Sequence, residues 1–113
     1  MKDIYGVIPY NGKEYRIAFN LNAMAEIQEE YGTINAWSDL TDREEPDAKA
    51  MIFGIRAMLN EGIDITNEEN GTNDPPLTLK QVGRLITEVG YKTVAQKMSE
   101  TVIKSLQSPE KNE

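Results

Sequence analysis

The sequence predicts an α+β domain that is mainly helical, in which an N-terminal β-hairpin packs on a small bundle of about four helices. Two observations lead to this fold class. Apolar and polar residues alternate on both sides of an Asn-Gly pair near the N-terminus, and the rest of the chain carries apolar residues at helical spacing between glycines and prolines. A chain of 113 residues suffices for one hydrophobic core. We therefore expect a single domain over residues 1–107 and a disordered polar tail over residues 108–113.

The β-hairpin is predicted over residues 4–19. Its turn is Asn11-Gly12, because a type I′ turn needs positive φ at both central positions and this pair tolerates it best. The resulting register pairs Tyr10 with Lys13, Ile8 with Tyr15, Gly6 with Ile17 and Ile4 with Phe19. It gathers apolar side chains on one face, namely Ile4, Ile8, Tyr15, Ile17 and Phe19. An isolated hairpin is marginally stable in water, so we expect this face to pack on the helices that follow.

An amphipathic helix is predicted over residues 21–31. Asn20 or Asn22 can accept a hydrogen bond from a first-turn N–H, and Gly32 supplies the left-handed residue common just after a helix. The positions at helical i, i+3, i+4 and i+7 spacing are Leu21, Met24, Ala25, Gln28 and Tyr31. We expect the hairpin to pack on the Leu21, Met24 and Tyr31 side of this helix.

Two helical segments are predicted between residues 33 and 62. The three-residue spacing of Ile34, Trp37 and Leu40 indicates a short helix or turn. Pro46 suits a first helical turn and opens a stronger helix over residues 47–61 that ends near Gly62. Its apolar stripe is Ala48, Met51, Ile52, Ile55, Met58 and Leu59. Gly54 within this helix indicates close packing against another element, because glycine there costs about 1 kcal/mol relative to alanine.

The segment 63–77 is polar, acidic and rich in turn formers, so we expect an exposed loop. Two helices follow it, near residues 79–89 and 93–107. Each is preceded by a capping-box pattern, Thr78 with Gln81 and Thr93 with Gln96, and Gly90 separates the two.

The composition excludes most familiar catalytic sites. The chain has no Cys and no His, so it lacks thiolate and imidazole ligands, Cys nucleophiles and His general bases. We expect no enzyme activity, no catalytic residues, no cofactor and no metal site. Ten of the nineteen acidic residues but three of the twelve basic residues lie between positions 39 and 74, so this segment carries the whole net charge of −7. Such a surface disfavours binding to nucleic acid or to an anionic membrane, and without an apolar run long enough for a membrane span or signal we expect a cytoplasmic protein.

Two acidic clusters could be interpreted as functional sites, but the residues around them do not fit such sites. Asp64, Thr66 and Glu68 alternate like calcium ligands, but the sixth and twelfth loop positions hold Glu69 and Pro75 instead of the required Gly and Glu. Glu26, Glu29 and Glu30 could supply paired carboxylates, yet no nucleophile or phosphate loop accompanies them. We interpret the first cluster as a solvated loop and the second as the polar side of a helix.

Three segments resemble the tail assembly chaperones of long-tailed phages and prophages: FNLNAMAEIQEEYG at 19–32, GIRAMLNEG at 54–62 and LTLKQVGRLI at 77–86. The resemblance covers most of the chain and contains no catalytic signature. It implies a small helical protein that binds the helical tape measure protein in the host cytoplasm, keeps it soluble and helps tail tube subunits assemble around it. It also implies a longer product of ribosomal frameshifting, and an A-rich run can encode Glu110-Lys111-Asn112.

A chaperone of this kind needs an apolar surface for its client. The candidate partner-binding residues are Trp37, Met51, Ile55 and Met58. We expect part of this set to be exposed in the monomer and buried by the client or by another copy of the chain. The expected partners are the tape measure protein and the tail tube protein, with self-association as a further expectation. The alternative is a structural tail or adaptor component that stays in the virion, which its detection in purified particles would favour.

Overall fold

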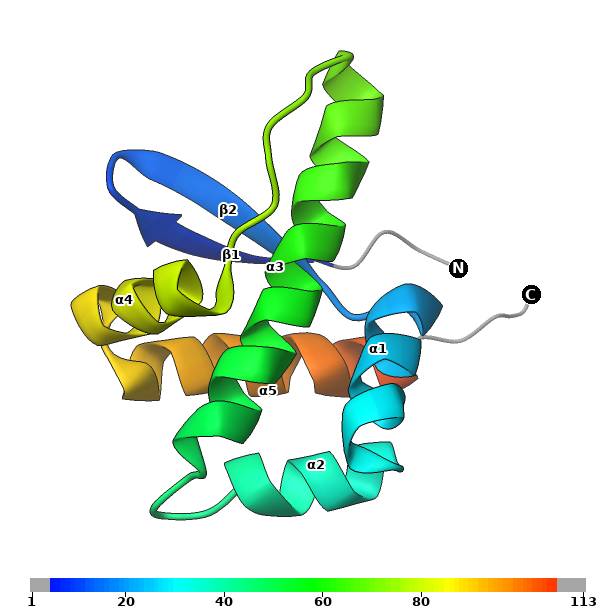
Figure 1. The fold of residues 1–113 in the computed structure, drawn as a ribbon, viewed down its shortest axis with the longest axis vertical. Coiled ribbons are helices and arrows are strands. Elements are labelled where there is room, and N and C mark those ends of the chain that lie inside the picture. The colour runs from blue at the N-terminus through cyan, green and yellow to red at the C-terminus, as the bar shows by residue number, and fades with distance from the viewer. Residues whose placement is uncertain (1–4, 108–113) are drawn as a thin grey trace.

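The computed structural model describes residues 5–107 of the chain, as a two-stranded sheet followed by five helices (Figure 1). The elements are β1 (Tyr5–Tyr10), β2 (Lys13–Ala18), α1 (Leu21–Tyr31), α2 (Ile34–Thr41), α3 (Ala48–Asn70), α4 (Leu79–Val89) and α5 (Tyr91–Gln107). The predicted α+β, mainly helical fold class is confirmed. The predicted tail over residues 108–113 lies outside the described residues.

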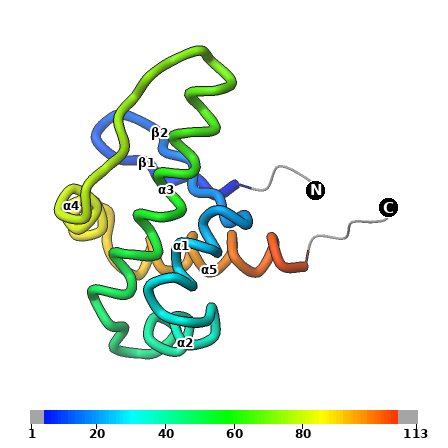
Figure 2. The backbone as a smooth tube through the Cα atoms, turned by 45° about the vertical axis from the view of Figure 1, so that its right-hand side comes forward, coloured from blue at the N-terminus to red at the C-terminus, as the bar shows by residue number. Residues whose placement is uncertain are grey.

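The long helix α3 is the centre of the architecture. It runs between α4 on one side and α1 on the other in both views (Figures 1 and 2). It also packs against β2 and α2, while α5 packs against β1 and α4. None of the helices within residues 5–107 is long and apolar enough to span a membrane.

The hairpin has the predicted register and turn. Ile8 lies opposite Tyr15, and Tyr10 lies opposite Lys13. The two turn residues, 11 and 12, have φ angles of 56° and 76°, as a type I′ turn requires. The further pair predicted for Ile4 falls on a residue outside the described range.

Helix α1 has the predicted bounds but buries a different face. The Asn20 side chain accepts a hydrogen bond from the Ala23 N–H at 3.1 Å, which selects Asn20 as the N-cap. Ala23 and Ile27 are the buried residues of this helix, whereas Leu21 is 76% exposed. The predicted stripe through Leu21 is therefore wrong. The hairpin packs mainly on α3 and α5 instead of on α1, because the chain turns away from the sheet directly after the buried Phe19.

Helix α3 is longer than the sequence analysis expected, and the loop predicted from residue 63 begins only after Asn70. Gly62 does not end the helix. Its lack of a side chain lets α3 approach β2, because a Cβ atom there would overlap the backbone carbonyl of Arg16. Ile63 is buried beyond this contact, and the helix ends at Gly71, which adopts the left-handed conformation with φ of 66°.

The capping box predicted for α4 is present, and the one predicted for α5 is not used. Thr78 and Gln81 bond reciprocally: the Gln81 N–H donates to Thr78 Oγ1 at 3.1 Å, and the Thr78 N–H donates to Gln81 Oε1 at 2.8 Å. Helix α5 begins at Tyr91, two residues earlier than expected. The Gly90 carbonyl already accepts from the Val94 N–H at 3.0 Å, so Thr93 lies inside the first turn and not before it.

Candidate protein-binding groove

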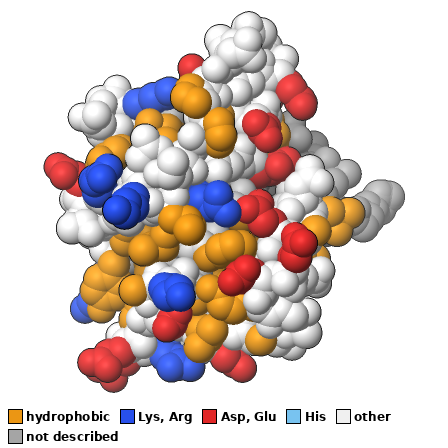
Figure 3. Space-filling view, viewed as in Figure 1, with side chains coloured by type: hydrophobic (Ala, Val, Ile, Leu, Met, Phe, Trp, Pro, Cys, Tyr) orange, Lys and Arg blue, Asp and Glu red, His pale blue; other side chains and the backbone are white. Residues whose placement is uncertain are grey.

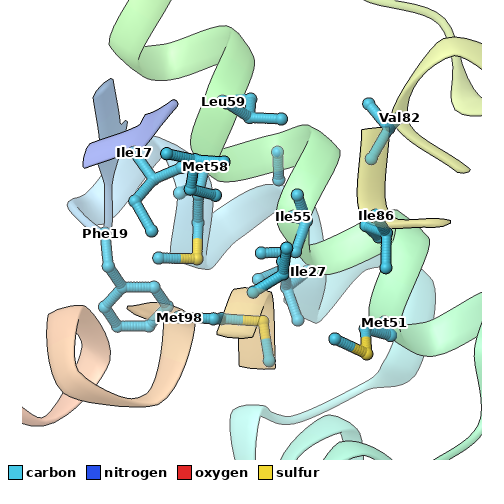
Figure 4. Close-up of a cluster of buried hydrophobic side chains, with 14 of the residues drawn as sticks. Ile17, Phe19, Ile27, Met51, Ile55, Met58, Leu59, Val82, Ile86 and Met98 are labelled. Carbon is cyan, nitrogen blue, oxygen red and sulfur yellow. The ribbon is translucent and has the colours of Figure 1, made fainter. Parts of the chain in front are cut away.

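The four side chains predicted to bind a partner all lie in the hydrophobic core. Trp37, Met51, Ile55 and Met58 are between 0 and 3% exposed. Figure 4 shows Met58 and Ile55 among core side chains from β2, α1 and α5. The Trp37 Nε1–H donates to the Ala50 carbonyl at 2.9 Å and so holds α2 on α3. The expectation that part of this set is exposed in the monomer is therefore wrong, and these residues stabilise the fold.

A different face of α3 remains open to solvent. The half-buried Ile52 and Phe53 lie in a hollow with a volume of about 1040 Å³, which α1, α3, α4 and the end of β1 surround. We call this hollow the aromatic groove. Its lining residues are Tyr10, Glu30, Tyr31, Lys49, Ile52, Phe53, Leu79, Lys80, Gly83, Arg84, Thr87 and Glu88. Figure 3 shows hydrophobic side chains gathered over α3 and α4 on this face, with Lys and Arg side chains among them.

Aromatic contacts fix the floor of the groove. The rings of Tyr31 and Phe53 meet edge to face, with centroids 5.6 Å apart and an interplanar angle of 79°. The guanidinium of Arg56 lies 5.6 Å from the Phe53 ring centroid and forms an ion pair with Glu26 at 3.3 Å. These contacts join the last turn of α1 to α3, so the floor is held in one arrangement.

Hydrogen bonds from α3 also fix the start of α4. Asn60 on α3 uses both ends of its side-chain amide: Nδ2–H donates to the Leu77 carbonyl at 3.2 Å, and Oδ1 accepts from the Leu77 N–H at 2.8 Å. The capping box follows at once and sets the direction of α4. As a result Leu79, the first residue of α4, stands at the groove edge and is 47% exposed.

The groove continues past α4 toward the start of α5. A second hollow of about 370 Å³ shares Ile52, Gly83 and Thr87 with the first and extends to Tyr91 and the segment 44–46. Gly83 lines both hollows and, having no side chain, does not fill the space where they meet. A Cβ atom at Gly83 would meet the Cδ1 atom of Ile52 at 3.5 Å, an ordinary van der Waals distance. The two hollows therefore adjoin at these shared residues.

Unpaired cations line the groove in a chain whose net charge is −7. Lys49, Lys80 and Arg84 make no side-chain hydrogen bond or ion pair with any residue in the range 5–107. By contrast, Lys13 and Arg16 pair with Asp74 and Glu69 at 3.3 and 2.9 Å. The aromatic groove therefore offers three cations to a ligand alongside the carboxylates at positions 30 and 88, and the second hollow adds the carboxylates at positions 44 and 45.

The phenol of Tyr31, which lines the groove, has a raised pKa. Burial raises the pKa of its phenol above the ordinary value of 10.0, and the carboxylates of Asp47 and Glu30 raise it further. The phenol is thus protonated at neutral pH and can donate a hydrogen bond to a ligand.

The acidic clusters weighed in the sequence analysis have other positions in the structure. Asp64, Thr66 and Glu68 lie on α3 and not in a loop. Glu26 pairs with Arg56, while Glu29 is exposed. The residues in the range 5–107 contain no group of three or more Asp and Glu side chains placed to hold a metal ion.

The groove does not follow from the single apolar stripe predicted for α3. A usable signal was present, since Met51, Ile52 and Phe53 are consecutive and point to different sides of a helix.

A comparison of the chain with protein-family models, with curated proteins and with solved structures finds no match in any of the three.

Proposed function

We propose that this protein is a tail assembly chaperone of a long-tailed phage or prophage. In this role it binds the tape measure protein in the host cytoplasm, keeps that protein soluble and assists assembly of the tail tube around it. The observation that supports the proposal is the aromatic groove, a long apolar surface left open on a small helical domain. Contiguous apolar surface that stays exposed on a folded domain can mark a site for a protein or ligand.

The shape of the groove favours a helical client. Its lining comes from helices α1, α3 and α4 apart from Tyr10, and the backbone N–H and C=O groups in the middle of these helices are hydrogen-bonded within them. A client segment buried there must satisfy its own backbone hydrogen bonds, which a helix does internally. A long helical tape measure protein would present such segments.

The test is co-expression with the product of the longest neighbouring gene, followed by affinity purification and a comparison of that protein's solubility with and without the chain. Co-purification of a client that precipitates when expressed alone is the expected result. A long protein that is soluble alone and does not bind would contradict the chaperone role. Recovery of the chain in purified particles would instead favour a structural tail component.

Two leucines provide a matched pair of variants that locates the client site. Leu21 and Leu79 are the first residues of α1 and α4, and both are exposed, but only Leu79 lines the groove. A glutamate is well placed near either helix N-terminus, so neither substitution should unfold the protein. We expect Leu79→Glu to weaken client binding roughly tenfold or more, because an apolar contact is lost and a charge is buried. We expect Leu21→Glu to bind as the native chain does.

A further inference from the structure

We propose that the aromatic groove selects an amphipathic helix whose apolar stripe is flanked by carboxylates. The inference rests on the proposed function in one respect, that the groove is the client site, and it adds the chemistry of the client. It follows from the charges around the groove and from the geometry of α4.

The cations are arranged along the groove edge. Lys80 and Arg84 are four residues apart on α4 and therefore lie on the same side of that helix. Like charges at this spacing disfavour an isolated helix, and no carboxylate within residues 5–107 pairs with either of them. Lys49 adds a third unpaired cation near the start of α3. Carboxylates on a docked helix would form ion pairs with these cations and so offset the repulsion between Lys80 and Arg84. Exclusion of water from the contact would strengthen these ion pairs.

The apolar floor sets the other half of the recognition. Ile52 and Phe53 of α3 and Tyr31 at the end of α1 line the groove together with the cations of α4 and with Glu30, the neighbour of Tyr31. A helix that inserts apolar residues at i, i+3, i+4 and i+7 spacing would cover this floor and place its flanking side chains over Lys80 and Arg84. The remaining acidic side chains of the protein would repel a client whose carboxylates do not lie opposite these cations.

The same geometry disfavours a nucleic acid as the occupant. Glu30 and Glu88 lie in the groove lining with the three cations, so a continuous phosphate backbone would meet both carboxylates. A helix can position its acidic residues opposite the cations and leave the sites opposite Glu30 and Glu88 neutral or basic. An oligonucleotide is therefore the alternative that the test must exclude.

The experiment measures binding of two fluorescently labelled peptides of about 18 residues, roughly five helical turns. Both carry the same leucine stripe, and they differ only in flanking residues that are all Glu in one and all Lys in the other. We expect the Glu-flanked peptide to bind about tenfold more tightly at low salt, with the preference shrinking as salt rises. Equal affinity for the two peptides, or no binding of either, would overturn the inference.

A charge-reversed variant assigns the preference to the groove. The triple variant K49E/K80E/R84E should reverse the preference, so that the Lys-flanked peptide binds more tightly. A matched variant, K92E/K97E/K104E, makes the same change in net charge on α5 outside the aromatic groove and should leave the preference unchanged. Circular dichroism and the fluorescence of the single tryptophan check that both variants fold. A loss of preference in both variants would show a general charge effect and overturn the inference.

Two further outcomes would assign the groove to another occupant. Displacement of the Glu-flanked peptide by a single-stranded oligonucleotide would indicate nucleic acid, and a dimer that dissociates in the groove triple variant would indicate a second copy of the chain. Failure of this inference is distinct from failure of the proposed function. If the long protein co-purifies but neither peptide binds, only the inference fails. If the Glu-flanked peptide binds but no client co-purifies, only the chaperone role fails.

Discussion

Gly54 of α3 faces the indole ring of Trp37 on α2 so closely that a Cβ atom at Gly54 would overlap the ring. The same ring donates its Nε1–H to the Ala50 carbonyl one turn earlier on α3. The hydrogen bond depends on the close approach, because the indole ring can reach the Ala50 carbonyl only if no side chain at position 54 blocks it. The glycine therefore fixes the position of α2 on the long helix.

We expect Gly54→Ala to lower the free energy of unfolding by about 1 to 3 kcal/mol. Overpacking a close contact costs about this much, and the higher helix propensity of alanine offsets only part of it. Urea denaturation followed by tryptophan fluorescence measures the effect at the contact itself, since Trp37 is the single tryptophan of the chain. An alanine variant as stable as the native protein would contradict the close approach.

The same substitution at Gly83 should have the opposite sign. Gly83 lies inside α4 with helical geometry, and a Cβ atom there would make an ordinary contact at 3.5 Å with Ile52. Alanine is favoured over glycine in a helix by about 1 kcal/mol, so Gly83→Ala should raise the free energy of unfolding by about that amount. Thermal unfolding monitored by circular dichroism should show a midpoint about 4 °C higher or more. A lower midpoint would mean that α4 lies closer to α3 than described.

Local signals in the sequence predicted the elements that depend on neighbouring residues. The Asn11-Gly12 turn set the hairpin register, and the Thr78 and Gln81 pair set the start of α4. In each case the determining contacts lie within a few residues, so the residue types alone identify them.

Features that depend on distant contacts could not be predicted in this way. Gly62 reads as a helix end, but it is an approach point for the Arg16 backbone more than forty residues earlier in the chain. Met51 and Met58 suit a core or an interface equally well, and their burial depends on how distant elements such as β2 and α2 pack on α3. The groove itself is made by side chains from three helices and the end of β1, which no single stretch of sequence reveals.

The perturbed Tyr31 predicts a loss of stability at alkaline pH. Its pKa is raised in the folded protein, so the folded state favours the protonated phenol relative to the unfolded chain. The resulting contribution to stability is fully present below the ordinary tyrosine pKa of 10.0, and it is lost as the pH rises through the higher pKa of Tyr31 in the folded protein. Absorbance of tyrosinate during a pH titration, compared with a Tyr31→Phe variant, isolates the residue. A Tyr31 that ionises at or below 10.0 would contradict its burial between Phe53 and the nearby carboxylates.

Arg56 should contribute to stability mainly through packing and only weakly through its charge. Its buried Nε–H has no hydrogen-bond partner among residues 5–107, and its ion pair partner Glu26 is 41% exposed, so water screens the attraction. Its guanidinium lies over the ring of Phe53 at the groove floor, 5.6 Å from the centroid, and long side chains of this kind also pack through their aliphatic stems. We expect Arg56→Met to change the free energy of unfolding by less than about 1 kcal/mol, because methionine keeps the apolar contact and removes the unpaired donor.

The alanine variant at the same position separates the two contributions. Arg56→Ala removes the stem as well as the charge, so we expect it to lower the free energy of unfolding by about 1 to 2 kcal/mol in the same urea measurement. A charge-dominated role would instead make the methionine and alanine variants equally unstable, and Glu26→Gln would then lower stability by the same amount. Because the Arg56 guanidinium contacts Phe53 of the groove floor, a loss of stability in the alanine variant would also show that this contact is formed without a client.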